Sequence, residues 1–590
     1  MDVDSSSTSS SDSSSAPRGS PPSRLQRGAK PGLVTEPLEK LDDLLDFTEA
    51  PLVAVEALRE MKRGDDPQAP RTLFCHDMMG GYLEDRFIHG CAKADAYRFH
   101  HWQIINTFVY YSHHMVTIPP PGWTSAGHRH GVQVLGTFTL EGDTGLKTFN
   151  MIHGRQLEQQ VGSQLARVAV LYKFDGWLIN IGFQMAKNCV RPLQRLVSAI
   201  AEQTHKAVLG SLVIWYDSVI RDGQLSPQNE LNANNAGFFQ LCDGILLNFR
   251  WKESRLKATA RYARDRKNDV YVGIDVFSRD TEYEGGYDTY KAVEAVRKHG
   301  LSAGIFAAGW VYETQGKAQF TENQYRLWSF PDHCCPEWRV TTLPLRSSFC
   351  QGFGDRLCRN GKVTSSLPWF NLCKQQLQPR DQGIWPCGNG SATAMVHTKE
   401  AYNGGGCLRL QYEPGDQPTE DKPYFRLFGC NMPLGSLVVT YAVDESGAEL
   451  FTGEVAVVLT VTSVTGEKEQ ILLGISTTVP DEKRYAATRH QDPNAVLDTS
   501  STNWATRKYY VRDLSDCPRA TLKEVGIGFL STQAKHCLLG QIVIERPHDE
   551  RSGADISGVD GNDSNEGLDD PALDVAADND AVPPEKRMRF

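Results

Sequence analysis

A short apolar stretch ends in a polar side chain that could do chemistry. Residues 174–182 read Phe-Asp-Gly-Trp-Leu-Ile-Asn-Ile-Gly, which predicts a buried strand with Asn180 at its end. Side chains alternate along a strand, so Asn180 and residue 182 point to the same face. An amide there could hold a sugar acetamide, and a carboxyl group two residues later could protonate the leaving oxygen. Residue 182 is glycine, so only the first of these groups is present.

The ends of the other expected strands carry a mixture of polar and aromatic side chains. This mixture suits a sugar, which presents apolar C–H patches and a rim of hydroxyls. Phosphates instead favour glycine-rich amide nests or basic clusters, and we see neither in the sequence. We therefore expect a carbohydrate site whose substrate-binding residues are His76, Asp77, His113, Glu141, Asp217, Asn248, Trp251, Asp275, Trp310 and Tyr312.

Each of these residues also has a structural interpretation. A strand-end aspartate such as Asp217 can cap a helix or pair with arginine. Trp251 and Trp310 can be packing residues whose indole N–H finds a partner. The histidine pair 113–114 lacks the spacing of a metal motif, so hydrogen-bonded loop histidines are favoured and we expect neither a metal nor a cofactor. The convergence of eight strand ends, more than any one residue, favours a site.

The fold follows from apolar runs of strand length that alternate with helical segments. Continuous runs such as Leu212-Val213-Ile214 are typical of parallel strands buried on both faces. The alternation predicts an eight-stranded β/α barrel over 70–380 with its site on the loops after the strand C-termini. The expected strands are 72–78, 108–113, 132–141, 174–181, 212–218, 244–249, 269–277 and 302–310, and the expected helices are 156–171, 191–206, 228–240, 252–267 and 288–300.

Other parts of the chain have different patterns. Short strands separated by Gly, Pro, Asp and Asn turns predict a β-sandwich accessory domain over 388–547. Leucines at helical spacing within 37–48 predict a short helical brace, followed by a linker, over 36–69. A Ser/Pro-rich tail at 1–35 and an acidic tail at 548–590 are expected to be disordered.

Composition limits the class of protein. The net charge is −10 over 590 residues, and no basic aromatic stripe is seen, which argues against a nucleic-acid partner. No apolar run resembles a signal peptide or a membrane helix. The 14 cysteines show no CxxC spacing, which favours reduced thiols. We therefore expect a cytosolic protein without a membrane partner.

Nine ordered blocks of the sequence closely resemble the cytosolic endo-β-N-acetylglucosaminidases of glycoside hydrolase family 85. They include FCHDMMGGY at 74–82, FDGWLINI at 174–181 and WYDS at 215–218, within a region that runs from residue 38 to 338. The remaining blocks are 111–114, 118–120, 128–132, 135–138, 271–277 and 309–313.

The resemblance implies cleavage between the two core N-acetylglucosamines of N-linked glycans, either free or protein-bound. It implies that the substrate acetamide attacks the anomeric carbon, with Asn180 orienting it and Tyr216 assisting, and that Trp251 and Trp310 line the sugar site. Substrate assistance departs from the two-carboxylate scheme. The family pattern expects Glu at 182, where this chain has Gly182. The sequence therefore leaves open an impaired hydrolase or a silent glycan-binding protein, and it suggests a splice or gene-model variant at 182–191.

Overall fold

The computed structural model describes residues 33–50, 53–64, 66, 68–77, 84–416, 422–446, 455–490, 503–514, 520–530, 532–533 and 535–547. The two expected disordered tails lie outside these residues, except for 33–35. There, Val34 forms a bridge with Phe87, and Thr35 is buried. Among the described residues, no helix combines the length and apolar character needed to cross a membrane.

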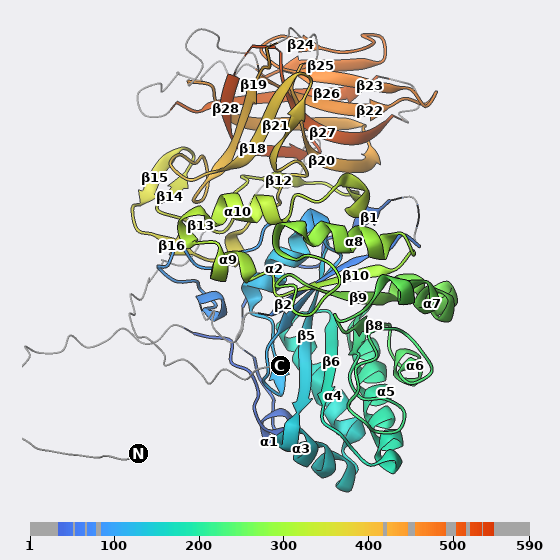
Figure 1. The fold of residues 1–590 in the computed structure, drawn as a ribbon. Coiled ribbons are helices and arrows are strands. Elements are labelled where there is room, and N and C mark those ends of the chain that lie inside the picture. The colour runs from blue at the N-terminus through green and yellow to red at the C-terminus, as the bar shows by residue number, and fades with distance from the viewer. Residues whose placement is uncertain are drawn as a thin grey trace, which may run out of the picture.

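Eight parallel strands close into a barrel, as the alternation of apolar runs predicts (Figure 1). The ring closes because β3 pairs with both β2 and β5, while the short strand β4 (Val116–Thr117) adds to β5 in the antiparallel direction. The barrel strands are β2 (Thr72–Asp77), β3 (Thr107–Tyr111), β5 (Gln133–Glu141), β6 (Gly176–Gly182), β7 (Leu212–Tyr216), β8 (Gly244–Leu247), β9 (Val270–Asp275) and β10 (Ser302–Phe306).

Alternation along β6 decides which side chains face the barrel interior. Leu178 belongs to a small interior cluster with Leu135 and Ile214. Ile179 and Ile181 instead belong to the large core between the strands and the surrounding helices. Because side chains alternate, Asn180 continues the interior row that begins at Leu178.

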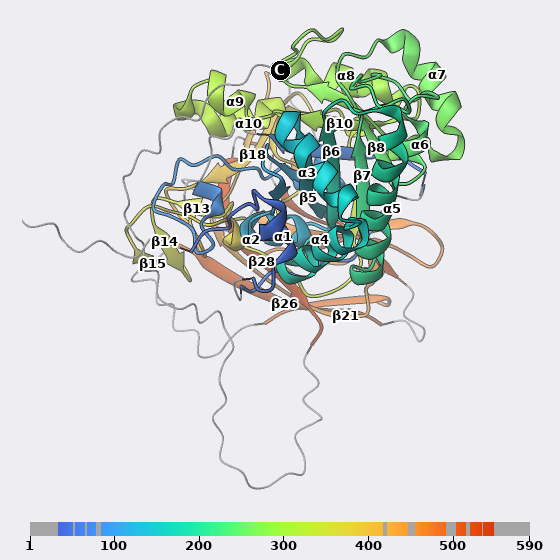
Figure 2. The same cartoon turned by 90° about the horizontal axis from the view of Figure 1, so that it is seen from below.

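Helices cover the outside of the barrel, and Figure 2 shows α4 and α5 beside its strands. Four of the five expected helices are confirmed as α4, α5, α7 and α8. The expected helix over 228–240 is wrong, because only its last turn is helical. The helices are α2 (Pro121–Arg129), α3 (Gly142–Gly154), α4 (Glu158–Tyr172), α5 (Val190–Ala207), α6 (Ala236–Phe239), α7 (Glu253–Ala263), α8 (Thr289–Arg297), α9 (Trp310–Thr314) and α10 (Phe320–Leu327).

Short 3-10 turns connect several of these elements. They are η1 (Glu84–Arg86), η2 (Trp102–Ile104), η3 (Lys187–Cys189), η4 (Arg264–Asp269), η5 (Gly286–Asp288), η6 (Lys317–Gln319), η7 (Asp332–Cys334) and η8 (Leu372–Lys374).

A short helix before the barrel packs on its outer layer. Helix α1 (Leu41–Leu45) buries Leu41 and Leu44. The Gln164 side chain of α4 donates to the backbone carbonyls of Leu44 and Leu45, at 3.1 and 2.6 Å. This contact attaches the segment to the barrel, and the role of 36–69 as a brace stays a prediction.

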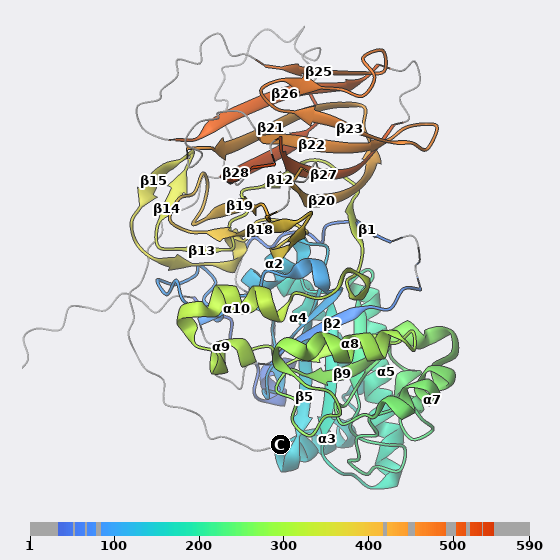
Figure 3. The ribbon, with the colours of Figure 1, turned by 45° about the horizontal axis from the view of Figure 1, so that its top comes forward.

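The C-terminal part forms two stacked β-sheets around one apolar core, which confirms the predicted sandwich (Figure 3). One sheet contains β1 (Met61–Arg63), β11 (Trp338–Val340), β20 (Tyr424–Pro433), β27 (Thr521–Phe529), β22 (Val455–Thr462), β23 (Lys468–Leu473) and β24 (Thr477–Thr478). The other contains β17 (Gly383–Cys387), β18 (Gly390–His397), β19 (Cys407–Glu413), β28 (Lys535–Glu545), β21 (Ser436–Asp444), β26 (Ala505–Asp513), β25 (Tyr485–Arg489) and β12 (Leu345–Ser347).

Four strands from outside the expected sandwich range join these sheets. They are β1, β11, β12 and β17, which pair with β11, β20, β28 and β18. Two small ribbons lie between barrel and sandwich, β13 (Phe353–Gly354) with β16 (Trp369–Phe370) and β14 (Leu357–Arg359) with β15 (Lys362–Ser365). The two parts of the chain are therefore joined by backbone hydrogen bonds as well as by side-chain packing.

Candidate active site at the barrel mouth

Asn180 lies at the C-terminal end of β6, buried among polar partners. Its Nδ2 donates to the Tyr111 hydroxyl at 3.1 Å and to Glu141 Oε1 at 2.8 Å. A carboxylate only accepts hydrogen bonds, so Glu141 holds the amide nitrogen on its own side. Within the described part of the chain, no donor contacts Asn180 Oδ1. The amide oxygen is the polar atom of this side chain that a ligand could contact.

Glu141 lies directly beside Gly182. The two residues are partners in the parallel register of β5 and β6, and a Cβ at 182 would lie 2.8 Å from Glu141 Cγ. The Glu141 side chain thus leans into the space that a side chain at 182 would need. Its second oxygen, Oε2, lies 2.9 Å from His113 Nδ1.

The His113 imidazole is coupled to this carboxyl group. The hydrogen bond to Glu141 raises the pKa of His113 above its ordinary value, against the opposing effect of partial burial. The charges of Glu141 and Asp77 raise the pKa in the same direction. The His113–Glu141 pair can therefore hold a proton closer to neutral pH than an isolated imidazole.

Two tyrosines complete the polar layer at the mouth. Tyr216 accepts a hydrogen bond from Asn248 Nδ2 at 3.0 Å. Burial is the main cause that raises the pKa of both Tyr111 and Tyr216, so both remain neutral hydroxyl groups. Both rings also pack on the interior apolar cluster. The layer can therefore hydrogen-bond an uncharged polar ligand without adding a phenolate charge.

Asp217 faces away from this layer and holds a loop. One of its oxygens accepts from the backbone N–H groups of Gln228 and Asn229, each at 2.8 Å, and the other accepts from Asn235 at 3.0 Å. Burial raises the pKa of Asp217 to about 6. These contacts anchor the loop after β7 and explain why most of 228–240 is not helical. Substrate binding by Asp217 stays a prediction.

His76 and Asp77 lie on opposite faces of β2. The His76 ring is buried among aromatic rings, including those of Tyr97, Phe108 and Trp123. Asp77 is next to the mouth, since its charge contributes to the raised pKa of Tyr111. The structure therefore brings Asp77, but not the His76 ring, toward the Asn180 group.

The remaining predicted residues have strong partners of their own. The fully buried Asp275 carboxyl group accepts from Arg279 at 2.7 and 3.0 Å. Trp251 is buried and donates to the Gly273 carbonyl at 2.6 Å. Their roles in substrate binding remain predictions, alongside the structural explanation that each contact provides.

Trp310 and Tyr312 follow β10 on the short helix α9. The half-buried Trp310 ring meets Tyr287 edge to face at 5.1 Å. Tyr312 is buried and donates to the Asp95 carbonyl at 3.1 Å. Trp310 therefore keeps an exposed part that a sugar could contact, whereas Tyr312 serves the packing of this corner.

Tyr111 is the partner that sequence reasoning missed. It stands two residues before His113 on an expected strand, and strand alternation could have placed it on the same face. The segment after Gly182 is also well packed, because Phe183 and Met185 are buried and the Met185 N–H donates to the Gly223 carbonyl at 2.8 Å. The stretch that departs from the family pattern therefore forms a coherent connection from β6 to α5.

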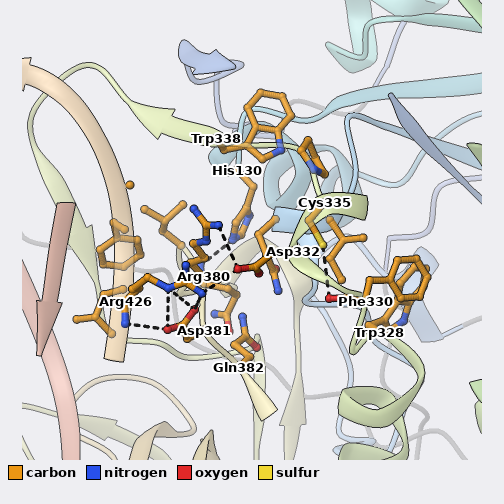
Figure 4. Close-up of a pocket in the computed structure, with 18 of the residues that line it drawn as sticks. His130, Trp328, Phe330, Asp332, Cys335, Trp338, Arg380, Asp381, Gln382 and Arg426 are labelled. Atoms are coloured by element: carbon orange, nitrogen blue, oxygen red, sulfur yellow. Dashed lines mark hydrogen bonds and ion pairs between the residues drawn. The ribbon is translucent and has the colours of Figure 1, made fainter. Parts of the chain in front are cut away.

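A cavity of about 220 Å³ lies elsewhere, between the barrel and the sandwich (Figure 4). Its lining includes His130, which precedes β5, so the cavity lies at the end of the barrel opposite the mouth. Arg426 is bound to Asp381 through several hydrogen bonds and lies 3.5 Å from Asp332. Because these charges satisfy one another, we place the candidate chemistry at the mouth and not at this cavity.

One group of side chains in the described residues could hold a metal ion. The donor atoms of Glu294, His333 and Cys334 lie within 4.8 Å of one another. They belong to α8 and η7, which do not contribute to the Asn180 layer. Nothing else at this position points to an ion.

Comparison with known proteins shows which proteins this chain resembles. The family model for glycosyl hydrolase family 85 matches residues 82–357. The cytosolic endo-beta-N-acetylglucosaminidase of Gallus gallus is 45% identical over 352 residues, which are 59% of this chain and 48% of that protein. The Homo sapiens protein of the same name is 41% identical over 387 residues, which are 65% of this chain and 52% of that protein.

The chain spans about half the length of these curated relatives. A solved structure, the glycoside hydrolase domain of Endo-D from Streptococcus pneumoniae R6, superimposes with a TM-score of 0.67. It covers 88% of this chain and 83% of its own, at 18% sequence identity. At this identity the superposition shows a shared fold.

Proposed function

We propose that the chain is a member of glycosyl hydrolase family 85 and an endo-β-N-acetylglucosaminidase, because it matches the family model over residues 82–357 and resembles relatives of that name. Its substrates would be N-linked oligosaccharides, glycopeptides and glycoproteins, cleaved between the two core N-acetylglucosamines. The names of the relatives support both this activity and a cytosolic location. The observation that carries the proposal is the interior amide of Asn180, with its nitrogen bound and its oxygen available.

The geometry suits a reaction in which the substrate assists itself. The Asn180 oxygen accepts the acetamide N–H and holds the acetamide oxygen below the anomeric carbon. Such orientation accelerates an intramolecular attack because the entropy of bringing the groups together is lost on binding. Tyr216, held by Asn248, would assist with a neutral hydroxyl. Water then opens the resulting oxazoline and leaves the anomeric configuration retained.

Gly182 supports a second candidate function, a cytosolic N-glycan-binding protein without turnover. Where the family places a carboxyl group, this chain has none of its own at 182. Loss of a positioned general acid costs roughly 10²- to 10⁴-fold in rate. The two functions share one binding site and differ only in proton transfer.

A high-mannose glycopeptide separates the two functions. Mass spectrometry should detect a peptide that retains a single N-acetylglucosamine if the chain is a hydrolase. Binding measured by calorimetry, without this product, would support the silent protein, and the absence of both would refute the proposed site. Gly182→Glu should raise turnover of a silent protein, provided that the Glu141 side chain moves aside, since it occupies the space beside residue 182.

A further inference from the structure

We propose that Glu141 and His113 together supply the proton that a carboxyl group at residue 182 would otherwise deliver. The inference rests on the proposed function, and it concerns how this particular chain protonates the leaving oxygen. The acid–base group would then lie at Glu141 on the neighbouring strand β5 instead of at residue 182 on β6.

The position of Glu141 carries the inference. Glu141 and Gly182 are register partners on adjacent parallel strands, and both strands end at the mouth. A Cβ at 182 would meet Glu141 Cγ at 2.8 Å. The Glu141 carboxyl group begins one bond beyond Cγ, so it lies in the space that a glutamate at 182 would enter. It also shares the Asn180 amide, which binds the reacting acetamide in the proposed mechanism.

Two other carboxyl groups at strand ends, those of Asp217 and Asp275, are engaged elsewhere. Asp217 points out of the barrel and holds the backbone of its loop. Asp275 is neutralised by two hydrogen bonds from Arg279. Glu141 differs from both because its side chain is partly exposed at the mouth and its partners are an amide and an imidazole.

The proton balance is complete within the pair and the substrate. In the reactive form the pair consists of the His113 imidazolium and the Glu141 carboxylate, and the transferable proton is the one between His113 Nδ1 and Glu141 Oε2, which are 2.9 Å apart. As the acetamide oxygen bonds to the anomeric carbon, the bond from that carbon to the leaving oxygen breaks, and the proton passes to that oxygen. Water then attacks the same carbon, the oxazoline C–O bond breaks, and the pair takes one proton back from the water.

The surroundings favour a proton on the pair. Asp77 raises the pKa of His113 by its charge, and the neighbouring Tyr111 and Tyr216 are neutral because burial raises the pKa of each. The charges that act on His113, those of Glu141 and Asp77, are both negative and favour the proton. Turnover should decline as pH rises through the pKa of His113.

The leaving group provides the test. A glycopeptide has a poor leaving group that needs a proton. In a p-nitrophenyl glycoside of the mannosyl-N-acetylglucosamine core, the leaving group is p-nitrophenolate, which departs without a proton. Glu141→Gln should lower turnover of the glycopeptide by roughly 10²- to 10⁴-fold and leave the first-turnover release of p-nitrophenolate from the aryl glycoside almost unchanged, because only the later attack of water on the oxazoline needs the pair. Asp143→Asn, an exposed change two residues later, is the matched control and should alter neither rate.

His113→Gln should repeat the pattern, with His114→Gln as its control, because His114 pairs with Glu39 instead of Glu141. Equal losses on both substrates would overturn the inference, since Glu141 would then act only by positioning Asn180. Undiminished glycopeptide turnover in Glu141→Gln would also overturn it. If the wild-type chain cleaves only the aryl glycoside, the inference fails while the proposed site stands. If it neither binds nor cleaves either substrate, the proposed function itself fails.

Discussion

The mouth and the base of the barrel each hold a histidine paired with a carboxyl group. At the mouth, His113 Nδ1 lies 2.9 Å from Glu141, and the two side chains are 45% and 32% exposed. At the base, His128 Nε2 lies 2.8 Å from Asp175, and the two are 4% and 11% exposed. The residue types and distances are nearly the same, whereas access to solvent is not.

The comparison indicates that the hydrogen-bond partners around each histidine–carboxyl pair distinguish the structural pair from the pair proposed to react. His128 uses its other nitrogen on the Glu56 carbonyl at 2.7 Å, and Asp175 also accepts from the Val134 N–H at 2.7 Å. The His128–Asp175 pair at the base of the barrel therefore joins α2 to the start of β5. At the mouth, the same kind of pair continues to Asn180, whose oxygen is the proposed contact for the substrate acetamide.

Among the substitutions that compare the mouth with the base of the barrel, the largest effect on activity should come from the Asn180 amide. Asn180→Ala should lower turnover by roughly 10²- to 10³-fold, the loss that follows removal of one preorganised polar contact. Mass spectrometry of the glycopeptide product measures it, and Asn188→Ala, an exposed change on η3, is the control. Wild-type turnover in Asn180→Ala would show that the mouth does not bind the acetamide as proposed.

A substitution at the base of the barrel should instead change the stability of the protein. Asp175→Ala removes one partner of a buried pair and should lower the free energy of unfolding by roughly 3–5 kcal/mol. Denaturant titration followed by circular dichroism gives this value, with the exposed Asp143→Ala as reference. A change below about 1 kcal/mol would mean that the His128–Asp175 pair contributes no more to stability than an exposed ion pair.

The two histidines should also differ in what their titration changes as pH rises: stability for His128 and turnover for His113. Burial is the largest single effect on the pKa of His128 and lowers it, but the hydrogen bond and charge of Asp175, together with the carbonyl and charge of Glu56, raise this pKa above its ordinary value. A raised histidine pKa gives stability that is fully present below the unfolded pKa and is lost as pH rises through the folded pKa. Unfolding free energies measured across this window should fall in the wild type and change less in His128→Gln. At the mouth the same rise in pH should lower turnover.

A substitution at the cavity between the barrel and the sandwich should have the smallest effect on stability and turnover. Asp381→Asn weakens the contacts to Arg426, and it should lower the free energy of unfolding by about 1 kcal/mol with no change in turnover. Thermal unfolding and the glycopeptide assay measure the two quantities on one sample. A large loss of turnover would mean that the cavity between barrel and sandwich takes part in the function.

Sequence patterns predicted much of this architecture. Apolar runs of strand length identified all eight barrel strands, because strands buried on both faces need continuous hydrophobic residues. The failed helix over 228–240 shows the limit, since Asp217 draws the backbone of 228 and 229 into a loop. His76 likewise ends an apolar strand, yet its ring enters an aromatic cluster that no local pattern reveals.

The sequence by itself determined the barrel, the face on which Asn180 lies and the missing carboxyl group at residue 182. These follow from local periodicity and residue identity, which need no knowledge of neighbours. Only the tertiary structure decided that Glu141 stands beside Gly182 and bridges Asn180 to His113. Register between strands depends on packing contributed by residues far apart in the chain, so no stretch of sequence contains it.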